Sequence, residues 1–239
     1  MVFLFCLLFF YYCNTSFDYE LYFLLISSQN ISTSLPTEFT KLPYLQLLDL
    51  SRNYLRGTIP PEWATMRLSN LSLMGNRLSG RFPTALTKIA TLLYLSIEGN
   101  RFSGPIPKEI ANLKNLDKLD LSSNDFTGHL PAALAKLTNL TYLRICDNNF
   151  TGKIPNFISQ WTQIERLDIQ GSSFEGPIPS SIFALTQLRD LRISDLKGGG
   201  STFPSLENML KLSILVLRNC LIHGKIPNYF KDMMYLNTM

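Results

Sequence analysis

Residues 116–137, LDKLDLSSNDFTGHLPAALAKL, contain the pattern that decides the fold of this chain. Leu119 and Leu121 alternate with polar neighbours, which is the period of a short strand with one apolar face. After the Leu-Pro pair, Leu134 and Leu137 are three residues apart, a spacing that suits a helical or 3₁₀ turn. The segment therefore predicts one strand followed by one convex turn.

The same pattern recurs along most of the 239-residue chain. In each copy a proline precedes the convex turn. These prolines lie about 24 residues apart, at Pro36, Pro60, Pro83, Pro107, Pro131, Pro155, Pro179, Pro204 and Pro227. A repeat of this length and pattern is a leucine-rich repeat, in which neighbouring units complete each other's core. We therefore expect an α/β repeat fold, a right-handed leucine-rich-repeat solenoid with a parallel concave sheet and an irregular or 3₁₀ convex side. About nine repeats would fill residues 17–239, with the chain ending inside a tenth.

Two columns of the repeat are interpreted as structural. An asparagine follows the strand where its amide can both donate to and accept from buried backbone groups, at Asn53, Asn76, Asn100, Asn124 and Asn148. Elsewhere in that column the residue changes, and Leu196 cannot form a hydrogen bond with its side chain. Two residues beyond the asparagine, an internal spine is expected, ending in Phe102, Phe126, Phe150 and Phe174.

The first forty residues differ in composition from the rest because they contain no Lys or Arg. The apolar run at residues 2–13 has the length of a signal-peptide core and is too short to span a membrane. We predict a signal peptide at residues 1–16, with a degenerate first exon as the alternative. Secretion would permit N-glycosylation at five sequons, Asn14, Asn30, Asn70, Asn139 and Asn149.

Composition and spacing argue against several classes of function. The net charge is only +4 and the basic residues are scattered, so we expect no nucleic-acid partner. His129 and His223 occupy variable positions, and no Cys, His and carboxylate cluster has metal-ligand spacing. We therefore expect no catalytic residue, no cofactor and no metal. Cys146 and Cys220 are three repeats apart, roughly 14 Å at one strand spacing per repeat, and are predicted to be free thiols.

Side chains that point outward from the strands should line the concave face. One column reads Asp49, Ser72, Ser96, Asp120, Arg144, Asp168, Arg192 and Val216, and the column beside it reads Tyr94, Lys118, Tyr142, Arg166 and Asp190. One interpretation is a ladder of surface ion pairs, each worth at most about 1 kcal/mol. The other is a partner-binding surface, because exposed Tyr and Arg are favoured as binding hot spots. Its residues would be Tyr94, Lys118, Asp120, Tyr142, Arg144, Arg166, Asp168 and Arg192.

An insertion at residues 196–202, LKGGGST, interrupts the repeat. The following proline comes 25 residues after the previous one, and the next comes after 23. Three consecutive glycines predict a flexible bulge. This bulge can be interpreted as a partner-binding loop or as a tolerated irregularity.

The LxGxIP extension after the asparagine resembles the plant-type leucine-rich repeat of receptor-like kinase ectodomains. Residues 38–63, EFTKLPYLQLLDLSRNYLRGTIPPEW, and residues 188–220, LRDLRISDLKGGGSTFPSLENMLKLSILVLRNC, are similar to subfamily VIII receptor-like serine/threonine kinases. In that family the repeats are followed by a malectin-like domain, one transmembrane helix and a cytoplasmic kinase. This sequence contains no kinase motif and lacks the paired-cysteine cap usual before such arrays, so the chain itself is not expected to be an enzyme.

The resemblance implies the extracellular ligand-binding region of a plant receptor-like kinase, with a role in transmembrane signal perception. The implied partners are an extracellular peptide, a glycan or another receptor ectodomain. The implied location is the secretory pathway, followed by either the plasma membrane or the extracellular space. Attachment to the membrane would require a C-terminal part that this sequence does not contain. Two alternatives stay open: a free secreted repeat protein that binds or inhibits a cell-wall enzyme, and a non-functional gene fragment.

Overall fold

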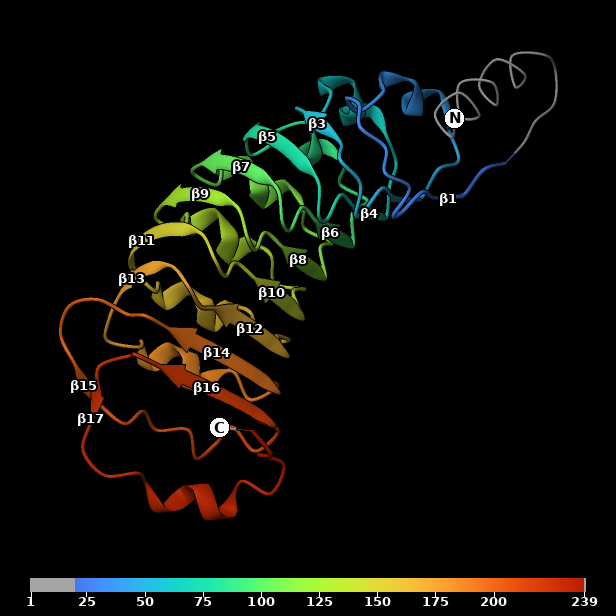
Figure 1. Ribbon diagram of the computed structural model, residues 1–239. Helices are drawn as coiled ribbons and strands as arrows, with labels where there is room; N and C mark the ends of the chain where they lie inside the picture. Colours follow the sequence, from blue (N-terminus) through green and yellow to red (C-terminus); the bar gives the residue numbers. More distant parts are fainter. Residues whose placement is uncertain (1–19, 239) are drawn as a thin grey trace.

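The computed structural model describes residues 20–238. These residues form one stack of short strands and tight turns that curves along its length (Figure 1). The predicted signal peptide at residues 1–16, including the Asn14 sequon, lies outside the described residues.

Nine parallel strands form the principal sheet, in the order in which they occur along the chain. They are β1 (Phe23–Leu25), β2 (Leu47–Asp49), β4 (Asn70–Ser72), β6 (Tyr94–Ser96), β8 (Lys118–Asp120), β10 (Tyr142–Arg144), β12 (Arg166–Ile169), β14 (Asp190–Ser194) and β16 (Ile214–Arg218). Leu119 pairs with Leu95 on one side and with Leu143 on the other, so the buried leucines stack in register. The predicted parallel sheet is confirmed, and it lines the inner side of the curve (Figure 1).

A second parallel sheet of six strands runs along the opposite side of the stack. Its strands are β3 (Arg56–Gly57), β5 (Arg77–Arg81), β7 (Arg101–Gly104), β9 (Asp125–Gly128), β11 (Asn149–Lys153) and β13 (Ser173–Glu175). The sequence analysis did not predict this sheet. It interpreted the residues after each asparagine only as an internal spine followed by a tight turn of the backbone. Gly104 and Gly128 close these strands with φ of +76° and +80°, a left-handed conformation that glycine adopts without a steric clash.

Residues 20–238 contain eight 3₁₀ helices, six of which (η2 to η7) lead from a strand of the second sheet to a strand of the principal sheet, and they confirm the expected 3₁₀ turns. They are η1 (Thr37–Lys41), η2 (Pro61–Thr65), η3 (Leu86–Lys88), η4 (Lys108–Asn112), η5 (Ala132–Lys136), η6 (Asn156–Gln160), η7 (Ser180–Ala184) and η8 (Asn228–Asp232). The repeat that follows Pro204 differs, because residues 205–211 form turns without a 3₁₀ helix. The stack is therefore irregular at one place among the described repeats.

The asparagine column lies inside the turns that follow the principal sheet. Asn124 donates through Nδ2 to the carbonyl oxygens of Ile97, Leu121 and Ser122 at 2.9, 3.2 and 3.0 Å. Its Oδ1 accepts from the backbone N–H of Phe102 at 3.0 Å. Each amide thus bridges adjacent repeats, and the same arrangement recurs at Asn53, Asn76, Asn100 and Asn148.

The aromatic spine runs through the interior beside this column. The rings of Phe102, Phe126, Phe150 and Phe174 stack with centroids 6.3, 6.2 and 6.0 Å apart. All four side chains are buried, so the spine belongs to the core. The continuous contact of one repeat with the next is what holds a solenoid together.

Both ends of the insertion at residues 196–202 contact neighbouring repeats, whereas residues 197–200 are exposed, and the flexibility of the three glycines stays a prediction. Leu196 is buried, and the backbone of Lys197 donates to Phe174 and accepts from Gly176, both at 2.8 Å. The short strand β15 (Ser201–Thr202) then pairs with β17 (Ile222–His223). A Cβ at Gly200 would lie 2.5 Å from the carbonyl oxygen of Leu221, so this glycine permits a close backbone approach.

Candidate functional site

The two outward columns of the principal sheet lie side by side on the concave face. Strand pairing aligns Tyr94, Lys118, Tyr142, Arg166 and Asp190 in one row, and Ser96, Asp120, Arg144, Asp168 and Arg192 in the next. We call these ten residues, together with Glu98, the concave stripe. The structure therefore brings together all eight residues that the sequence nominated for partner binding.

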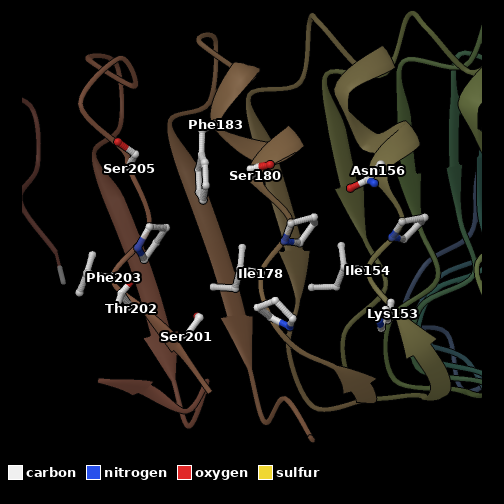
Figure 2. A pocket seen from close by; sticks show the side chains of 14 residues that line it. Lys153, Ile154, Asn156, Ile178, Ser180, Phe183, Ser201, Thr202, Phe203 and Ser205 are labelled. Carbon is white, nitrogen blue, oxygen red and sulfur yellow. The ribbon is translucent and has the colours of Figure 1, made fainter. Parts of the chain in front are cut away.

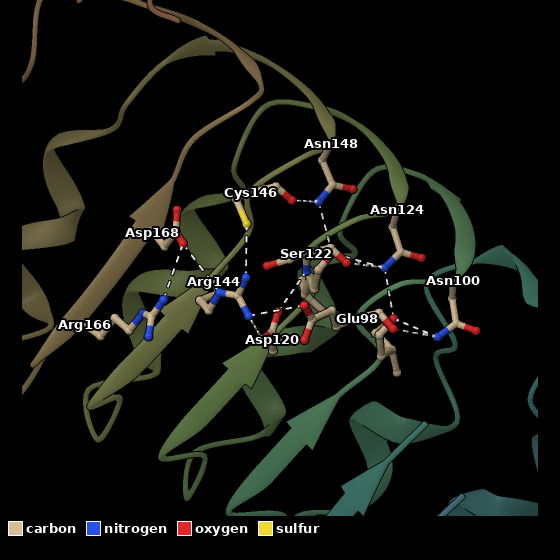
Figure 3. A network of polar contacts seen from close by, with 12 residues as sticks. Glu98, Asn100, Asp120, Ser122, Asn124, Arg144, Cys146, Asn148, Arg166 and Asp168 are labelled. Carbon is tan, nitrogen blue, oxygen red and sulfur yellow. Dashed lines mark hydrogen bonds and ion pairs between the residues drawn. The ribbon is translucent and has the colours of Figure 1, made fainter. Parts of the chain in front are cut away.

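Arg144 lies at the centre of this stripe, between carboxylates from three neighbouring repeats (Figure 3). Its Nη1 is 2.9 Å from Asp120 Oδ2 and 3.3 Å from Glu98 Oε1. Its Nε is 3.5 Å from Asp168 Oδ2. The sequence analysis did not include Glu98, although it lies two residues beyond Ser96 and so continues the outward alternation by one step.

The carboxylates of this network are less exposed than a surface ladder would require. Asp120 and Asp168 are only 4% and 3% exposed, so the expectation of surface ion pairs is corrected to partly buried ones. Burial raises the pKa of Asp168 above its usual value, although a backbone hydrogen bond and three arginines oppose the shift. Burial and then the nearby Asp120 carboxylate raise the pKa of Glu98. The charged side chains at the centre of the stripe are therefore largely paired with one another.

Arg144 remains charged within this network. Burial opposes its charge, but the carboxylates of Asp120 and Glu98 outweigh that effect and hold the pKa of Arg144 above its usual value. Removing the guanidinium would leave partly buried carboxylates without a counter-ion, which is strongly destabilising. Arg144 thus has a structural role in addition to any contact with a partner.

The more accessible part of the stripe lies around Tyr142 and Arg166. The Arg166 guanidinium carbon is 5.4 Å from the centroid of the Tyr142 ring, within cation–π range. Both side chains line a polar cavity of about 440 Å³, whose other walls are Asp117, Lys118, Thr141, Glu165, Arg189 and Asp190. Arg192 contacts Asp190 through Nε at 2.8 Å, which leaves its two Nη atoms for a ligand.

The four described sequons lie on different sides of the stack. Asn30, Asn139 and Asn149 are exposed, and a glycan on any of them would extend into solvent. Asn70 is half-buried in β4, where strand pairing places it next to Tyr94. A glycan at Asn70 would therefore cover the N-terminal side of the concave stripe.

Other kinds of site receive no support from the described part of the chain. Within residues 20–238, no group of three or more His, Cys, Asp or Glu side chains is arranged to hold a metal ion. No helix in that range is long and apolar enough to cross a membrane. Cys146 and Cys220 are free and buried, and burial raises the pKa of Cys220 to about 11, which disfavours the reactive thiolate.

Comparison with known protein families agrees with this architecture. The family described as a leucine-rich repeat region matches residues 67–220, which is more than half of the chain, and a leucine-rich repeat model matches residues 44–66. The chain belongs to the leucine-rich repeat family. Both models describe repeats, so the family relationship accounts for the fold and the stacked columns.

This leucine-rich-repeat chain is similar to plant receptor kinases. It is 56% identical over 67 residues to a protein of Arabidopsis thaliana named as a probable LRR receptor-like serine/threonine-protein kinase, a match that covers 28% of the chain and 7% of that kinase. A second such kinase of the same plant is 52% identical over 69 residues, again 7% of its length. The matched segments thus span a small part of these relatives.

Solved structures show the same fold over most of the chain. A TDR receptor structure superposes with a TM-score of 0.86 and 26% identity, covering 92% of this chain and 38% of that one. The Arabidopsis receptor kinase HAESA, solved with the peptide hormone IDA and the co-receptor SERK1, superposes with a TM-score of 0.78. HAESA is 33% identical, and the match covers 87% of this chain and 35% of that one.

Proposed function

We propose that this chain is the extracellular partner-binding repeat region of a plant receptor-like kinase, and that its concave stripe binds an extended peptide. The observation that carries the proposal is the cavity of about 440 Å³ on the concave sheet, which Tyr142 and Arg166 line, with Arg192 beside it in the adjacent row. Tyr and Arg are the residue types that most often dominate binding energy. A partner-binding surface of this kind needs no catalytic group.

The kinship to receptor kinases supports a peptide as the ligand. The HAESA ectodomain was solved with a peptide hormone, and the GASSHO1/SCHENGEN3 ectodomain was solved with CASPARIAN STRIP INTEGRITY FACTOR 2. These partners belong to those proteins. For this chain, they favour a peptide over a glycan or a second ectodomain, which remain the other candidate partners.

The chemistry of the stripe favours a peptide with carboxylate or carbonyl groups near its centre. The Nη atoms of Arg192 are suited to planar oxygen acceptors, which guanidinium groups bind in bidentate fashion. The Tyr142 ring offers an apolar surface that is stiffened by its contact with Arg166. An extended chain crossing β8, β10, β12 and β14 would meet one outward pair of side chains per strand.

Membership of a particular kinase subfamily also forms part of the proposal. Similarity at residues 38–63 and 188–220 favours a subfamily VIII kinase, in which a malectin-like domain, a membrane span and a kinase would belong to the same full-length protein. Secretion and a cell-surface location follow from that assignment, as does signal perception on peptide binding. A free secreted inhibitor of a wall enzyme and a non-functional fragment are the competing readings.

The direct test is selection of binders from a displayed library of random dodecapeptides, followed by calorimetry with the selected peptide. Tyr142→Ala combined with Arg166→Gln should weaken binding by at least about thirtyfold, since hot-spot residues are worth about 2 kcal/mol each. The matched control is Tyr54→Ala combined with Arg77→Gln. That pair makes the same type of contact, with the Arg77 guanidinium carbon 4.6 Å from the Tyr54 ring, but it lies away from the concave sheet.

The two double variants separate the proposal from its alternatives. Unchanged affinity in the control, with circular dichroism showing that both variants are folded, supports binding at the stripe. Equal losses in both variants, or an unchanged affinity in the stripe variant, would remove the peptide proposal.

A further inference from the structure

A group of arginines lies on the second sheet, on the side of the stack away from the concave stripe (Figure 1). The arginine face consists of Arg56 on β3, Arg77 and Arg81 on β5, and Arg101 on β7. Strand pairing sets Arg56 beside Arg77. Ser79, at the middle of β5, pairs with Arg101 on the next strand. Residues that are scattered along the sequence thus come together around one hydroxyl group, on three adjacent repeats.

These four arginines are exposed, and their charge is not balanced by the chain. None of them forms an ion pair with a carboxylate of residues 20–238. By contrast, Arg144, Arg166 and Arg192 of the concave stripe are each paired with an aspartate. Like charges on neighbouring strands destabilise a sheet, so the clustering has a cost that a bound polyanion would offset.

The charge of the second sheet changes farther along the stack. Asp125 lies on β9, and Lys153 on β11 is aligned with Glu175 on β13. Lys153 is also the one charged side chain among those that line a groove of about 660 Å³ on this side (Figure 2). Within the described part of the second sheet, unbalanced positive charge is therefore concentrated on β3, β5 and β7.

The surface between the arginines offers hydroxyl groups and little apolar area. Leu78 and Phe102, which alternate with the outward residues of β5 and β7, have no exposed surface. Ser79 and Ser103 are half-buried on the outward side, and each hydroxyl group can both donate and accept. Gly80 has no side chain, so a ligand could approach the sheet closely there. The groups available to a ligand are thus guanidinium and hydroxyl groups.

This chemistry favours an acidic polysaccharide over an acidic peptide. A peptide is recognised through a free strand edge or through pockets for its side chains. β5 is paired with β3 on one side and with β7 on the other, and its apolar residue Leu78 is buried. Uronate sugars carry a carboxylate and hydroxyl groups on every unit. The carboxylates match the guanidinium groups, and the sugar hydroxyls match those of Ser79 and Ser103.

A single-stranded nucleic acid fits this face less well. Such a ligand needs aromatic rings on which its bases stack. The ring beside the face is that of Tyr54, and the Arg77 guanidinium carbon already lies 4.6 Å from its centroid. The phosphates alone would then have to supply the binding.

We propose that the arginine face binds an acidic polysaccharide built of uronate sugars, independently of the concave stripe. Its carboxylates accept from the four guanidinium groups, and its hydroxyl groups exchange hydrogen bonds with Ser79 and Ser103. Since the face extends over three repeats, successive sugar units meet successive strands. A regular polymer thus matches a regular surface.

Binding of fluorescein-labelled dodecagalacturonate to the chain would be measured by fluorescence polarisation. Arg81→Gln combined with Arg101→Gln should weaken this binding by about tenfold. The matched control is Lys153→Gln combined with Lys225→Gln, which removes the same charge from exposed side chains. Both lysines follow the glycine of their repeat, as Arg81 does. The control should change binding by less than about twofold, and circular dichroism checks that both variants are folded.

Two further comparisons test the chemistry of the face. The methyl ester of the same oligosaccharide has no carboxylate charge and should bind at least about tenfold more weakly than the free acid. Arg81→Lys combined with Arg101→Lys keeps the charge but loses the planar fork, so its affinity should fall between those of the wild type and the glutamine variant. The stripe variant Tyr142→Ala with Arg166→Gln should bind dodecagalacturonate normally, which distinguishes this inference from the proposed function.

Four results would overturn the inference. They are no binding of dodecagalacturonate to the wild-type chain, equal losses in the arginine-face variant and the lysine control, equal binding of the free acid and its methyl ester, and equal or tighter binding of dodecaglutamate or a twelve-residue oligothymidylate. The last result would assign the face to an acidic peptide or to a nucleic acid.

Discussion

At the scale of single residues, the asparagine column shows how few atoms hold adjacent repeats in register. The Asn124 amide contacts four buried backbone groups: three carbonyl oxygens share its two N–H hydrogens, and one backbone N–H donates to its Oδ1. An unpaired buried backbone group costs about 1 to 3 kcal/mol. Stability of the stack should therefore depend on such positions more than on neighbouring surface residues.

We predict that Asn124→Ala lowers the free energy of unfolding by at least about 3 kcal/mol, because several buried groups lose their partner together. Urea unfolding followed by circular dichroism measures this. The control is Asp125→Ala, an exposed neighbour, which should change stability by less than about 0.5 kcal/mol. Similar effects of the two substitutions would contradict a structural role for the column.

Glu98 makes the stability of the stripe depend on pH. Its pKa in the folded chain is raised above 4.5, so the folded chain holds this proton more tightly than the unfolded chain does. The stabilisation that this proton provides is complete below the ordinary pKa and is lost as pH rises through the raised value. Glu98 therefore favours a stripe that is more stable in mildly acidic solution.

Replacing Glu98 by Gln should remove this contribution. As pH rises from below the ordinary pKa of a glutamate carboxyl group, the unfolding free energy of Glu98→Gln should fall less steeply than that of the wild type. Urea unfolding at a series of pH values gives both slopes. Identical slopes would show that the Glu98 carboxylate titrates alike in the folded and unfolded chains.

At the scale of elements, the aromatic spine links the repeats from within. Phe126 touches Phe102 and Phe150 in the spine and also lies 6.1 Å from Phe82. We predict that Phe126→Ala costs about 3 to 5 kcal/mol, as large buried side chains do. Phe126→Leu should cost less, because Leu55 and Leu78 fill the same column in earlier repeats. Thermal unfolding would rank the three chains, and equal losses for Ala and Leu would argue against a packing role.

The insertion at residues 196–202 gives a second prediction at this scale. Gly200→Ala should destabilise the chain by about 1 to 3 kcal/mol, because its Cβ would meet the carbonyl oxygen of Leu221 at 2.5 Å. Gly199→Ala should be tolerated, since no heavy atom lies within 4 Å of the corresponding Cβ. Denaturation measures stability, and hydrogen exchange at the Lys197 amide reports whether its hydrogen bond to Phe174 persists. Neutral effects of both substitutions would contradict the close approach of Gly200 to Leu221.

These elements differ in how well the sequence predicts them. The period-two leucines and the three-residue spacing after proline fix the principal sheet and the 3₁₀ turns, because each depends on side chains alone. The second sheet escaped prediction because its short strands are set by backbone pairing between repeats. The pairing of β15 with β17 also depends on the close approach of the Gly200 backbone to the distant Leu221, which no local pattern reveals.

At the scale of the whole molecule, the repeat period aligns the outward columns, so the neighbours in the concave stripe follow from the sequence. The burial of these side chains does not follow from the sequence, since it depends on how far each side chain extends over its neighbours. For this reason Asp120 and Asp168 are buried, and Glu98 joins the network from outside the two predicted columns.

The central claim is that a peptide partner binds along the concave stripe. Hydroxyl-radical footprinting of the chain with its selected dodecapeptide tests this most directly, because tyrosine rings report on their own exposure. We predict that Tyr142 becomes protected, while the exposed rings of Tyr44, Tyr54 and Tyr235 react as before. Protection at Tyr54 or Tyr235 with none at Tyr142 would contradict the claim.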